Sequence, residues 1–184
     1  MSESSFLHPL RVIRVCGLDE GMRVADFGAG SGFFTRAAAH EVGEDGVVWA
    51  VDINRELLPR IKNIATAEGL ENVEVIHGDI SVVEGSHLPT GSFDFVIVTN
   101  VLFSIEDKKE VVAEMRRVFT PSGRALVVDW SGSFGGLGPH ETHVFTRREA
   151  QKLFESMGFV VVKEVPTGEY HWGFIVRKKS ATSN

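Results

Sequence analysis

Three glycines alternate in a short segment between a predicted strand and a predicted helix. Gly28, Gly30 and Gly32 follow Asp26 there, and Ala29 separates the first two. Glycine allows a tight turn and lets a ligand approach the backbone closely, while the first turn of the following helix directs free N–H groups at that ligand. A carboxylate in front of the loop is unfavourable beside a pyrophosphate and suits a ligand with positive charge. We therefore expect Asp26 and the glycine loop to bind a cationic small molecule.

Polar side chains follow three further predicted strands, each at the carboxyl end of its strand. The residues concerned are Asp52 with Ile53, Gly78 with Asp79 and Ile80, and Asn100. A carboxylate at the position of Asp52, ~20 residues after a glycine loop, can accept both hydroxyls of a ribose. Asp79 can accept from an adenine amino group with Ile80 against the ring, and Asn100 offers donors and an acceptor to an amino-acid end. Because ligands bind at the carboxyl ends of parallel strands, these groups predict one common site.

Each carboxylate also has a purely structural interpretation. Asp26 can brace the glycine loop, Asp52 can cap the next helix in competition with Asn54, and Asp79 can cap a short segment from Ser81. Each alternative is reasonable alone. Their occurrence at successive strand ends, in chain order, favours the ligand-binding interpretation.

A segment without periodicity, residues 131–145, holds two of the three candidate catalytic histidines. We interpret this glycine-rich segment as a lid over the substrate site, with a disordered surface connection as the alternative. His140 and His143 lie in it, and His171 begins the last predicted strand. His140 or His143 is a candidate for a catalytic base. His171, the third candidate catalytic residue, could line the substrate pocket, although it could equally be a half-buried strand histidine. The glycine and proline context argues against a shared metal ion, so we expect no metal site.

Predicted strands and helices alternate along the chain. Strands are expected over 22–27, 47–51, 73–76, 93–98, 124–130, 159–165 and 170–177, and helices over 8–18, 32–42, 54–69, 107–117 and 146–158. This alternation implies βαβ units and a mainly parallel sheet. The last two strands are joined by a turn too short for a crossover helix, so they should pair antiparallel. The expected core includes Phe33, Phe34, Phe93 and Phe95.

The composition is that of one ordinary globular domain. The chain has 184 residues, is 43% hydrophobic and 24% charged, and has a formal net charge of −6. These values exclude a disordered chain, and a single cysteine, Cys16, excludes an internal disulfide. The acidic balance disfavours nucleic-acid binding and anionic membrane surfaces. No apolar run reaches the ~18 residues of a membrane span, and the first five residues lack signal-peptide features, so we expect a cytoplasmic protein.

From about Gly17 to Lys178, these motifs resemble the class I S-adenosylmethionine-dependent methyltransferases. The chain is most similar to the small ubiquinone/menaquinone-biosynthesis-type group. The resemblance implies an α/β, Rossmann-like three-layer sandwich with strand order 3-2-1-4-5-7-6 and strand 7 antiparallel. It implies a single methyltransferase domain over residues 1–184, with an N-terminal helix within 1–20. It also implies S-adenosyl-L-methionine as cofactor and methyl transfer to an unidentified small-molecule acceptor.

The same resemblance assigns roles to the strand-end residues. Asp26 and the glycines that follow it match the loop beside the methionine part of the cofactor, and Asp52 matches the ribose-binding acid. Asp79 with Ile80 matches the adenine contact, and Asn100 the position near cofactor and acceptor. The Asn/Asp-Pro-Pro-Tyr/Phe signature of amino-methylating nucleic-acid enzymes is missing after the fourth strand. The chain also resembles arsenite methyltransferases around the first motif, but these need several cysteines.

Two other functions remain as alternatives. An NAD(P)-dependent oxidoreductase on a similar sheet is disfavoured because Phe33 stands where a dinucleotide fingerprint has a third small residue. The second alternative is a non-catalytic interaction module that binds the cofactor but has no acceptor site. The oligomeric state is not predicted by any of these features.

Overall fold

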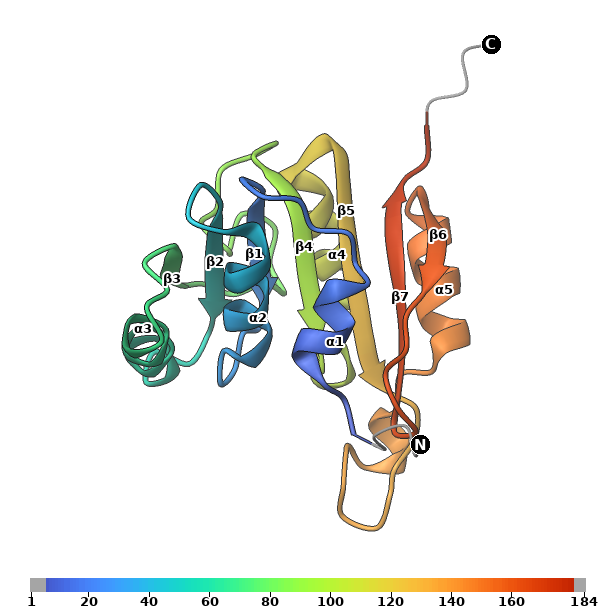
Figure 1. Ribbon diagram of the computed structural model, residues 1–184. Helices are drawn as coiled ribbons and strands as arrows, with labels where there is room; N and C mark the ends of the chain where they lie inside the picture. Colours follow the sequence, from blue (N-terminus) through green and yellow to red (C-terminus); the bar gives the residue numbers. More distant parts are fainter. Residues whose placement is uncertain (1–5, 181–184) are drawn as a thin grey trace.

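The computed structural model describes residues 6–180, so the features expected of residues 1–5 lie outside it. Its centre is a seven-stranded sheet of order β3-β2-β1-β4-β5-β7-β6 (Figure 1). The strands are β1 (Arg23–Phe27), β2 (Val47–Asp52), β3 (Val73–His77), β4 (Phe93–Thr99), β5 (Phe119–Trp130), β6 (Phe159–Glu164) and β7 (His171–Lys178). All neighbouring pairs are parallel except those that involve β7, which is antiparallel to both β5 and β6. The predicted strand order and the reversed last strand are confirmed.

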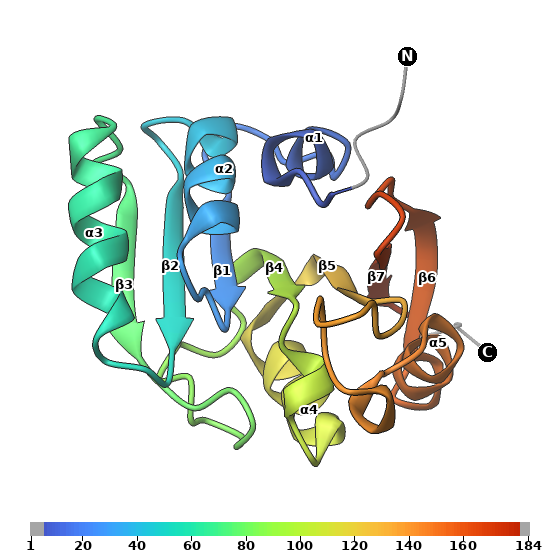
Figure 2. The same ribbon diagram turned by 90° about the horizontal axis from the view of Figure 1, so that it is seen from below.

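Helices cover both faces of the sheet. In the view from below in Figure 2, α1 (Pro9–Arg14) and α2 (Phe33–Val42) lie on one side of the sheet, and α4 (Lys108–Val118) and α5 (Arg147–Ser156) lie on the other. Helix α3 (Leu57–Ala67) shares the face of α2, since Ile61 and Ala65 belong to the same buried cluster as Ala38. The strand residues alternate between this cluster and a second one beneath α4 and α5, as the two-residue period of a strand requires. This arrangement is the expected three-layer sandwich.

Local sequence signals explain where the helices on the second face begin. The Asp107 side chain accepts from Lys109 N at 3.0 Å and caps α4. Thr146 and Glu149 form a reciprocal capping box at the start of α5, which satisfies backbone donors that a helix terminus leaves free. Asn54 instead accepts from Glu56 N at 3.0 Å, in the turn before α3, so it does not cap that helix directly.

Two predicted boundaries differ most from those of the structure. The first helix ends at Arg14 rather than at 18, because Gly17 turns the chain with φ 68°. Its buried residues are Val12 and Ile13, whereas Leu10 is 42% exposed; Cys16, just after the helix, is also buried. The fifth strand begins at Phe119, directly after α4, because Phe119 already pairs with Phe93 before a register shift in β4.

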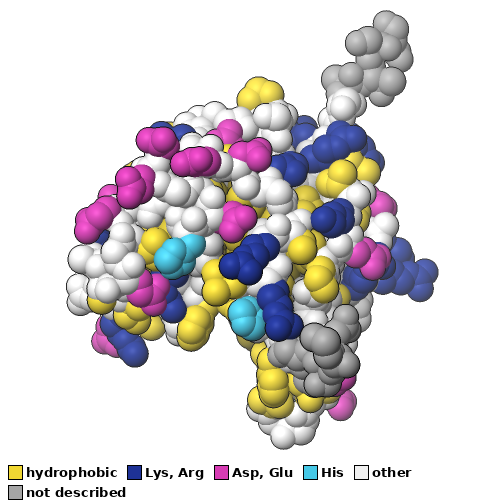
Figure 3. All heavy atoms as spheres, in the orientation of Figure 1, with side chains coloured by type: hydrophobic (Ala, Val, Ile, Leu, Met, Phe, Trp, Pro, Cys, Tyr) yellow, Lys and Arg dark blue, Asp and Glu magenta, His cyan; other side chains and the backbone are white. Residues whose placement is uncertain are grey.

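The segment over 131–145 has more local structure than its composition suggests. Phe134 and Leu137 form an isolated antiparallel bridge, and Glu141–His143 form a 3₁₀ turn. Figure 3 shows this part of the chain as a projection from the lower edge of the molecule, with hydrophobic side chains on its surface; Leu137 is 46% exposed. Among residues 6–180, none of the helices combines the length and the apolar character that crossing a bilayer requires.

Candidate functional site

The glycine loop between β1 and α2 is held in place by the end of the neighbouring strand. Gly28 N and Ala29 N both donate to Val51 O, at 2.9 and 3.1 Å. Gly28 has φ 71°, and a Cβ there would lie 2.8 Å from Val101 Cγ2. Gly30, in contrast, faces open space, since a Cβ there would meet only Gly28 O at 4.0 Å. The loop is therefore closely packed beneath and free above, as a ligand-binding turn must be.

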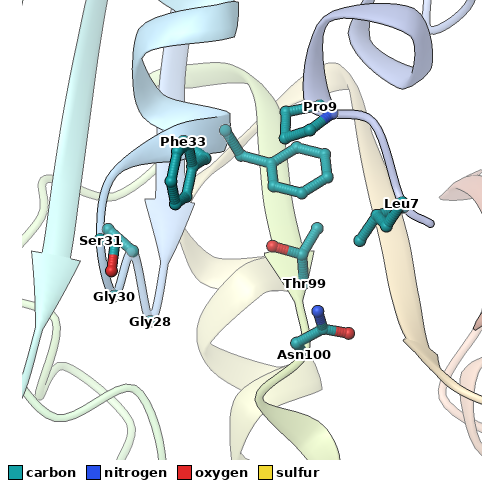
Figure 4. A pocket seen from close by; sticks show the side chains of 10 residues that line it. Leu7, Pro9, Gly28, Gly30, Ser31, Phe33, Thr99 and Asn100 are labelled. Atoms are coloured by element: carbon teal, nitrogen blue, oxygen red, sulfur yellow. The ribbon is translucent and has the colours of Figure 1, made fainter. Parts of the chain in front are cut away.

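A pocket of about 410 Å³ opens between the glycine loop, the N-terminal segment and the end of β4 (Figure 4). Its lining residues are Leu7, Pro9, Gly28, Ala29, Gly30, Ser31, Phe33, Phe34, Thr99 and Asn100. Phe33 was predicted in the core, but this is wrong: it is 61% exposed. Phe33 is the first residue of α2 and lines the pocket instead, with Arg36 Cζ 5.1 Å from its ring centroid. Phe34 is buried, and Phe93 and Phe95 are core residues as predicted.

Asp26 is completely buried at the end of β1. Its Oδ2 accepts from Thr35 Oγ1 of α2 at 2.6 Å, while Oδ1 has no hydrogen-bond partner among the described residues. Burial raises the pKa of Asp26 to about 7, the Thr35 hydrogen bond opposes this effect, and the nearby Asp52 charge adds to it. Asp26 thus braces the loop through α2, and its second oxygen remains available for a cationic group.

Asn100 follows β4 in a left-handed conformation, with φ 53°. Asn100 N donates to Val128 O at 2.9 Å, so the backbone is fixed by β5. The side chain lines the pocket (Figure 4), and its Oδ1 is buried without a partner within the described chain. Near the ends of the adjacent strands β1 and β4, two buried acceptor oxygens therefore lack donors within residues 6–180, which is an unfavourable state in the absence of a ligand.

Asp52 supports the loop from β2 and is 8% exposed. Its Oδ2 accepts from Gly30 N at 2.8 Å and its Oδ1 accepts from Asn54 N at 2.8 Å. The carboxylate therefore has a structural role in the loop, but it does not cap the next helix, the alternative considered from the sequence, since α3 begins at Leu57. It also keeps acceptor capacity, since a carboxylate offers about four lone-pair sites. Ile53, the next residue, is 63% exposed.

Asp79 lies after β3 and, like Asp52, combines a structural role with remaining capacity to accept hydrogen bonds. Its Oδ1 accepts from Ser81 N at 2.9 Å and from Ser81 Oγ at 2.6 Å, which is the capping geometry of the structural alternative. Ile80 is buried, and Gly78 packs so closely that a Cβ there would lie 2.8 Å from Gly85 O. Neither Asp52 nor Asp79 lines the 410 Å³ pocket, which covers only the loop, β4 and N-terminal side of the rim.

The three candidate catalytic histidines fall into two different environments. His140 and His143 are exposed in the 3₁₀ turn, and His140 Nδ1 lies 2.9 Å from Thr142 Oγ1. His171 is buried against Trp130, with ring centroids 4.2 Å apart, and neither ring nitrogen has a partner among the described residues. Burial lowers the pKa of His171 to about 4. Within residues 6–180, no three His, Cys, Asp or Glu side chains are grouped so that they could hold a metal ion.

Sequence reasoning missed several lining residues. Leu7 and Pro9 come from the N-terminal segment, and Thr99 is the last residue of β4. Thr99 could have been found, because it is a polar residue directly after the apolar run of a buried strand. Leu7 and Pro9 gave no comparable signal. Leu7, Pro9 and Phe33 form an apolar part of the pocket lining, and the residues at the end of β4 form a polar part. This combination suits a cationic ligand that also has apolar groups.

Comparisons with known proteins point in one direction. A family profile described as "Methyltransferase domain" matches residues 18–169. A ubiquinone/menaquinone biosynthesis C-methyltransferase, UbiE of Neisseria meningitidis serogroup A, is 28% identical over 159 residues, which are 86% of this chain and 61% of that protein. The chain thus spans about three fifths of the length of this curated relative.

Solved structures agree in fold. A SAM dependent methyltransferase from Aquifex aeolicus superposes with a TM-score of 0.83 and 28% identity, over 94% of this chain and 90% of the other. CrArsM, an arsenic (III) S-adenosylmethionine methyltransferase from Chlamydomonas reinhardtii, superposes with a TM-score of 0.70 and 24% identity, over 89% of this chain and 65% of the other. The second likeness shows the fold alone.

Proposed function

Since the chain belongs to the methyltransferase-domain family, we propose that it binds S-adenosylmethionine and transfers its methyl group to a small-molecule acceptor. The observation that carries the proposal is a pair of buried oxygens, Asp26 Oδ1 and Asn100 Oδ1, for which the described part of the chain supplies no donor. Asn100 lines the pocket, and Asp26, which does not line it, lies two residues before the lining residue Gly28. Both oxygens would be satisfied by a ligand with N–H donors and positive charge. An amino-acid end next to a sulfonium has these properties.

The strand-end residues divide the cofactor between them in this proposal. Asp26, Gly28, Ala29, Gly30, Gly32 and Asn100 hold the methionine end. Asp52 accepts from the ribose beside Ile53, and Gly78, Asp79 and Ile80 bind the adenine. The residues fit this group because Gly30 leaves open space above the loop and because the carboxylates match a ligand of net positive charge.

When bound, the cofactor supplies a methyl group that its sulfonium has already activated. The chain then has to align the acceptor with that carbon and exclude water, and positioning of this kind can supply ~7–11 kcal/mol. The apolar walls of Leu7, Pro9 and Phe33 favour an acceptor with an apolar surface. Because His171 is neutral and weakly basic at pH 7, we propose that it orients rather than deprotonates the acceptor.

The exposed histidines belong to a further part of the proposal. His140 and His143 lie in the segment 131–145. We propose that the chain is a single domain and that this segment closes over the acceptor as a lid. A role as base is open to them only in the closed arrangement. The four residues from Asn100 to Phe103 lack the nucleic-acid amino-methylation signature, so we propose a small molecule rather than a nucleic acid as acceptor.

Calorimetry with S-adenosylhomocysteine and with NAD separates the proposal from its alternatives. We expect binding of S-adenosylhomocysteine and none of NAD; binding of NAD alone would favour an oxidoreductase. The second step is incubation of the protein and methyl-labelled S-adenosylmethionine with fractionated small-molecule extracts. Tight cofactor binding without label transfer to any fraction would favour the non-catalytic interaction module.

A further inference from the structure

The segment between β3 and β4 folds back on itself around Asp79. Asp79 N donates to Gly85 O at 2.8 Å, and a Cβ on Gly85 would collide with Asp79 O. A Cβ on Gly78 would lie 2.8 Å from Gly85 O and 2.9 Å from Ser86 O. The backbone at Gly78 and Asp79 therefore rests directly on the backbone of residues 85–86, and its position depends on theirs.

The far side of this segment is held in a backbone conformation that side-chain residues rarely adopt. Glu84 has φ 67° and His87 has φ 59°, both in the left-handed region. Such residues persist only where surrounding contacts fix them. Ile80 and Leu88 contribute apolar contacts, since both are buried in the cluster beneath α4. These contacts anchor the two side chains but do not account for the backbone at 84–86.

Glu114 of α4 supplies the missing polar contacts. Its side chain is completely buried, with Oε2 accepting from Glu84 N at 2.7 Å. Oε1 accepts from Ser86 N at 3.3 Å and from Ser86 Oγ at shorter range. Both residues that flank Gly85 are thus bound to one carboxylate, and Gly85 is the residue that contacts Asp79.

Arg117, one turn further along α4, keeps that carboxylate charged. Its Nη2 lies 2.6 Å from Glu114 Oε1 and its Nε lies 2.8 Å from Oε2. The same guanidinium donates to Thr90 Oγ1 at 2.9 Å, further along the segment. Burial alone would raise the pKa of Glu114, but the hydrogen bonds from Arg117, Ser86 and Glu84 outweigh it and hold the pKa below its ordinary value. Glu114 is therefore an anionic acceptor at neutral pH.

We propose that Glu114 is a positioning residue for the adenine end of the cofactor site. It acts through Glu84 and Ser86 on Gly85, and through Gly85 on Asp79 and the adjacent Ile80. The inference rests on the proposed function, because it takes the residues after β3 to contact the adenine. The proposal predicts that a substitution at Glu114, on the buried face of α4, alters how strongly the protein prefers adenine over related bases.

Stabilisation of the fold does not by itself explain the buried ion pair of Glu114 and Arg117, because apolar residues of similar volume often stabilise a core equally well. Helix α4 already has an apolar buried face, formed by Val111, Val112, Met115 and Val118. A charged group with two oxygens is needed, however, to receive the converging N–H and O–H donors of Glu84 and Ser86. This requirement explains why a carboxylate stands at position 114.

The test compares Glu114→Gln with Glu110→Gln, the same chemical change one turn earlier on α4. Calorimetry measures the dissociation constants of S-adenosylhomocysteine and of S-inosylhomocysteine, in which the adenine amino group is replaced by oxygen. We expect the wild type and Glu110→Gln to prefer the adenine ligand. In Glu114→Gln the affinity for S-adenosylhomocysteine should fall about tenfold, as for one charge-assisted hydrogen bond, while that for S-inosylhomocysteine changes little.

The outcomes separate this inference from the proposed function. If the wild type binds neither ligand, the proposed function fails. If it binds with an adenine preference that Glu114→Gln retains in full, the positioning role is refuted and the carboxylate is only structural. Should Glu114→Gln fail to fold, Ser86→Ala removes a single hydroxyl from the same network. It should reduce the adenine preference in the same direction, and an unchanged preference in that variant would equally overturn the inference.

Discussion

Replacement of Asp26 by asparagine should stabilise the unliganded protein at alkaline pH and weaken its binding of a cationic ligand. The carboxylate is completely buried, and its Oδ1 has no donor among the described residues. An asparagine keeps the shape and can still accept from Thr35 Oγ1, but it removes the charge. The unfavourable term, an ionised group in a site with few compensating donors, is therefore lost.

The size of the effect follows from the pKa of Asp26. Burial raises it from an ordinary value of 3.8 to about 7, a difference that corresponds to ~4 kcal/mol. Between these two pKa values the folded state binds more protons than the unfolded state, so the free energy of unfolding falls as the pH rises. From pH 5 to pH 8 this one group should lower the stability of the wild type by about 2–3 kcal/mol. Asp26→Asn should lack that component.

Urea denaturation of both proteins at pH 5 and pH 8 measures the difference. Asp129, whose pKa burial raises to about 6, contributes with the same sign but equally to both proteins, so it cancels. Thr35→Val serves as a matched control: it removes the hydrogen bond that lowers the Asp26 pKa and should move the stability loss to higher pH. If wild type and Asp26→Asn lose the same stability between the two pH values, Asp26 is not the buried titrating group described above.

Three further substitutions, one of them with a matched control, test the site. Asp52→Ala should weaken binding of S-adenosylhomocysteine by at least ~1–3 kcal/mol, because ribose donors lose a charged acceptor; unchanged affinity in calorimetry would remove Asp52 from the site. Gly28→Ala should lower both Tm and affinity, because φ is 71° and the new Cβ would lie 2.8 Å from Val101 Cγ2. Gly69→Ala has a similar φ of 77° with nothing within 4 Å, so it separates backbone strain from collision. Phe33→Ala should change the free energy of unfolding by less than ~0.5 kcal/mol in urea denaturation, as expected for an exposed side chain. A larger loss of stability would show that Phe33 is a core residue after all.

The topology could be predicted because it depends on signals that act over short distances. Apolar runs and the intervening amphipathic stretches defined βαβ units, and the short connection between β6 and β7 left only an antiparallel pairing. The two boundary errors have the same origin. Neither the end of α1 near Gly17 nor the early start of β5 at Phe119 is decided by local pattern, since one depends on a turn and the other on pairing with Phe93.

The site could be predicted only in part. Strand-end acids are visible in a sequence, but the pocket walls come from Leu7 and Pro9, which lie on a segment whose position depends on packing against α2. The same limitation explains the error at Phe33. A helical pattern identifies an apolar residue, but it does not say whether the first residue of a helix packs in the core or lines a pocket.

The choice between a structural and a functional role for each acid was too narrow. Asp52 fixes Gly30 and Asn54, and Asp26 fixes α2 through Thr35, so both shape the loop before any ligand arrives. A loop organised in this way loses little conformational entropy on binding. The oxygen that Asp26 leaves without a donor lowers the stability of the unliganded protein, and a bound cation would offset that loss. Ligand binding and stability are therefore linked through the Asp26 carboxylate. Its role in binding accounts for the presence of a buried acid that is unfavourable for folding.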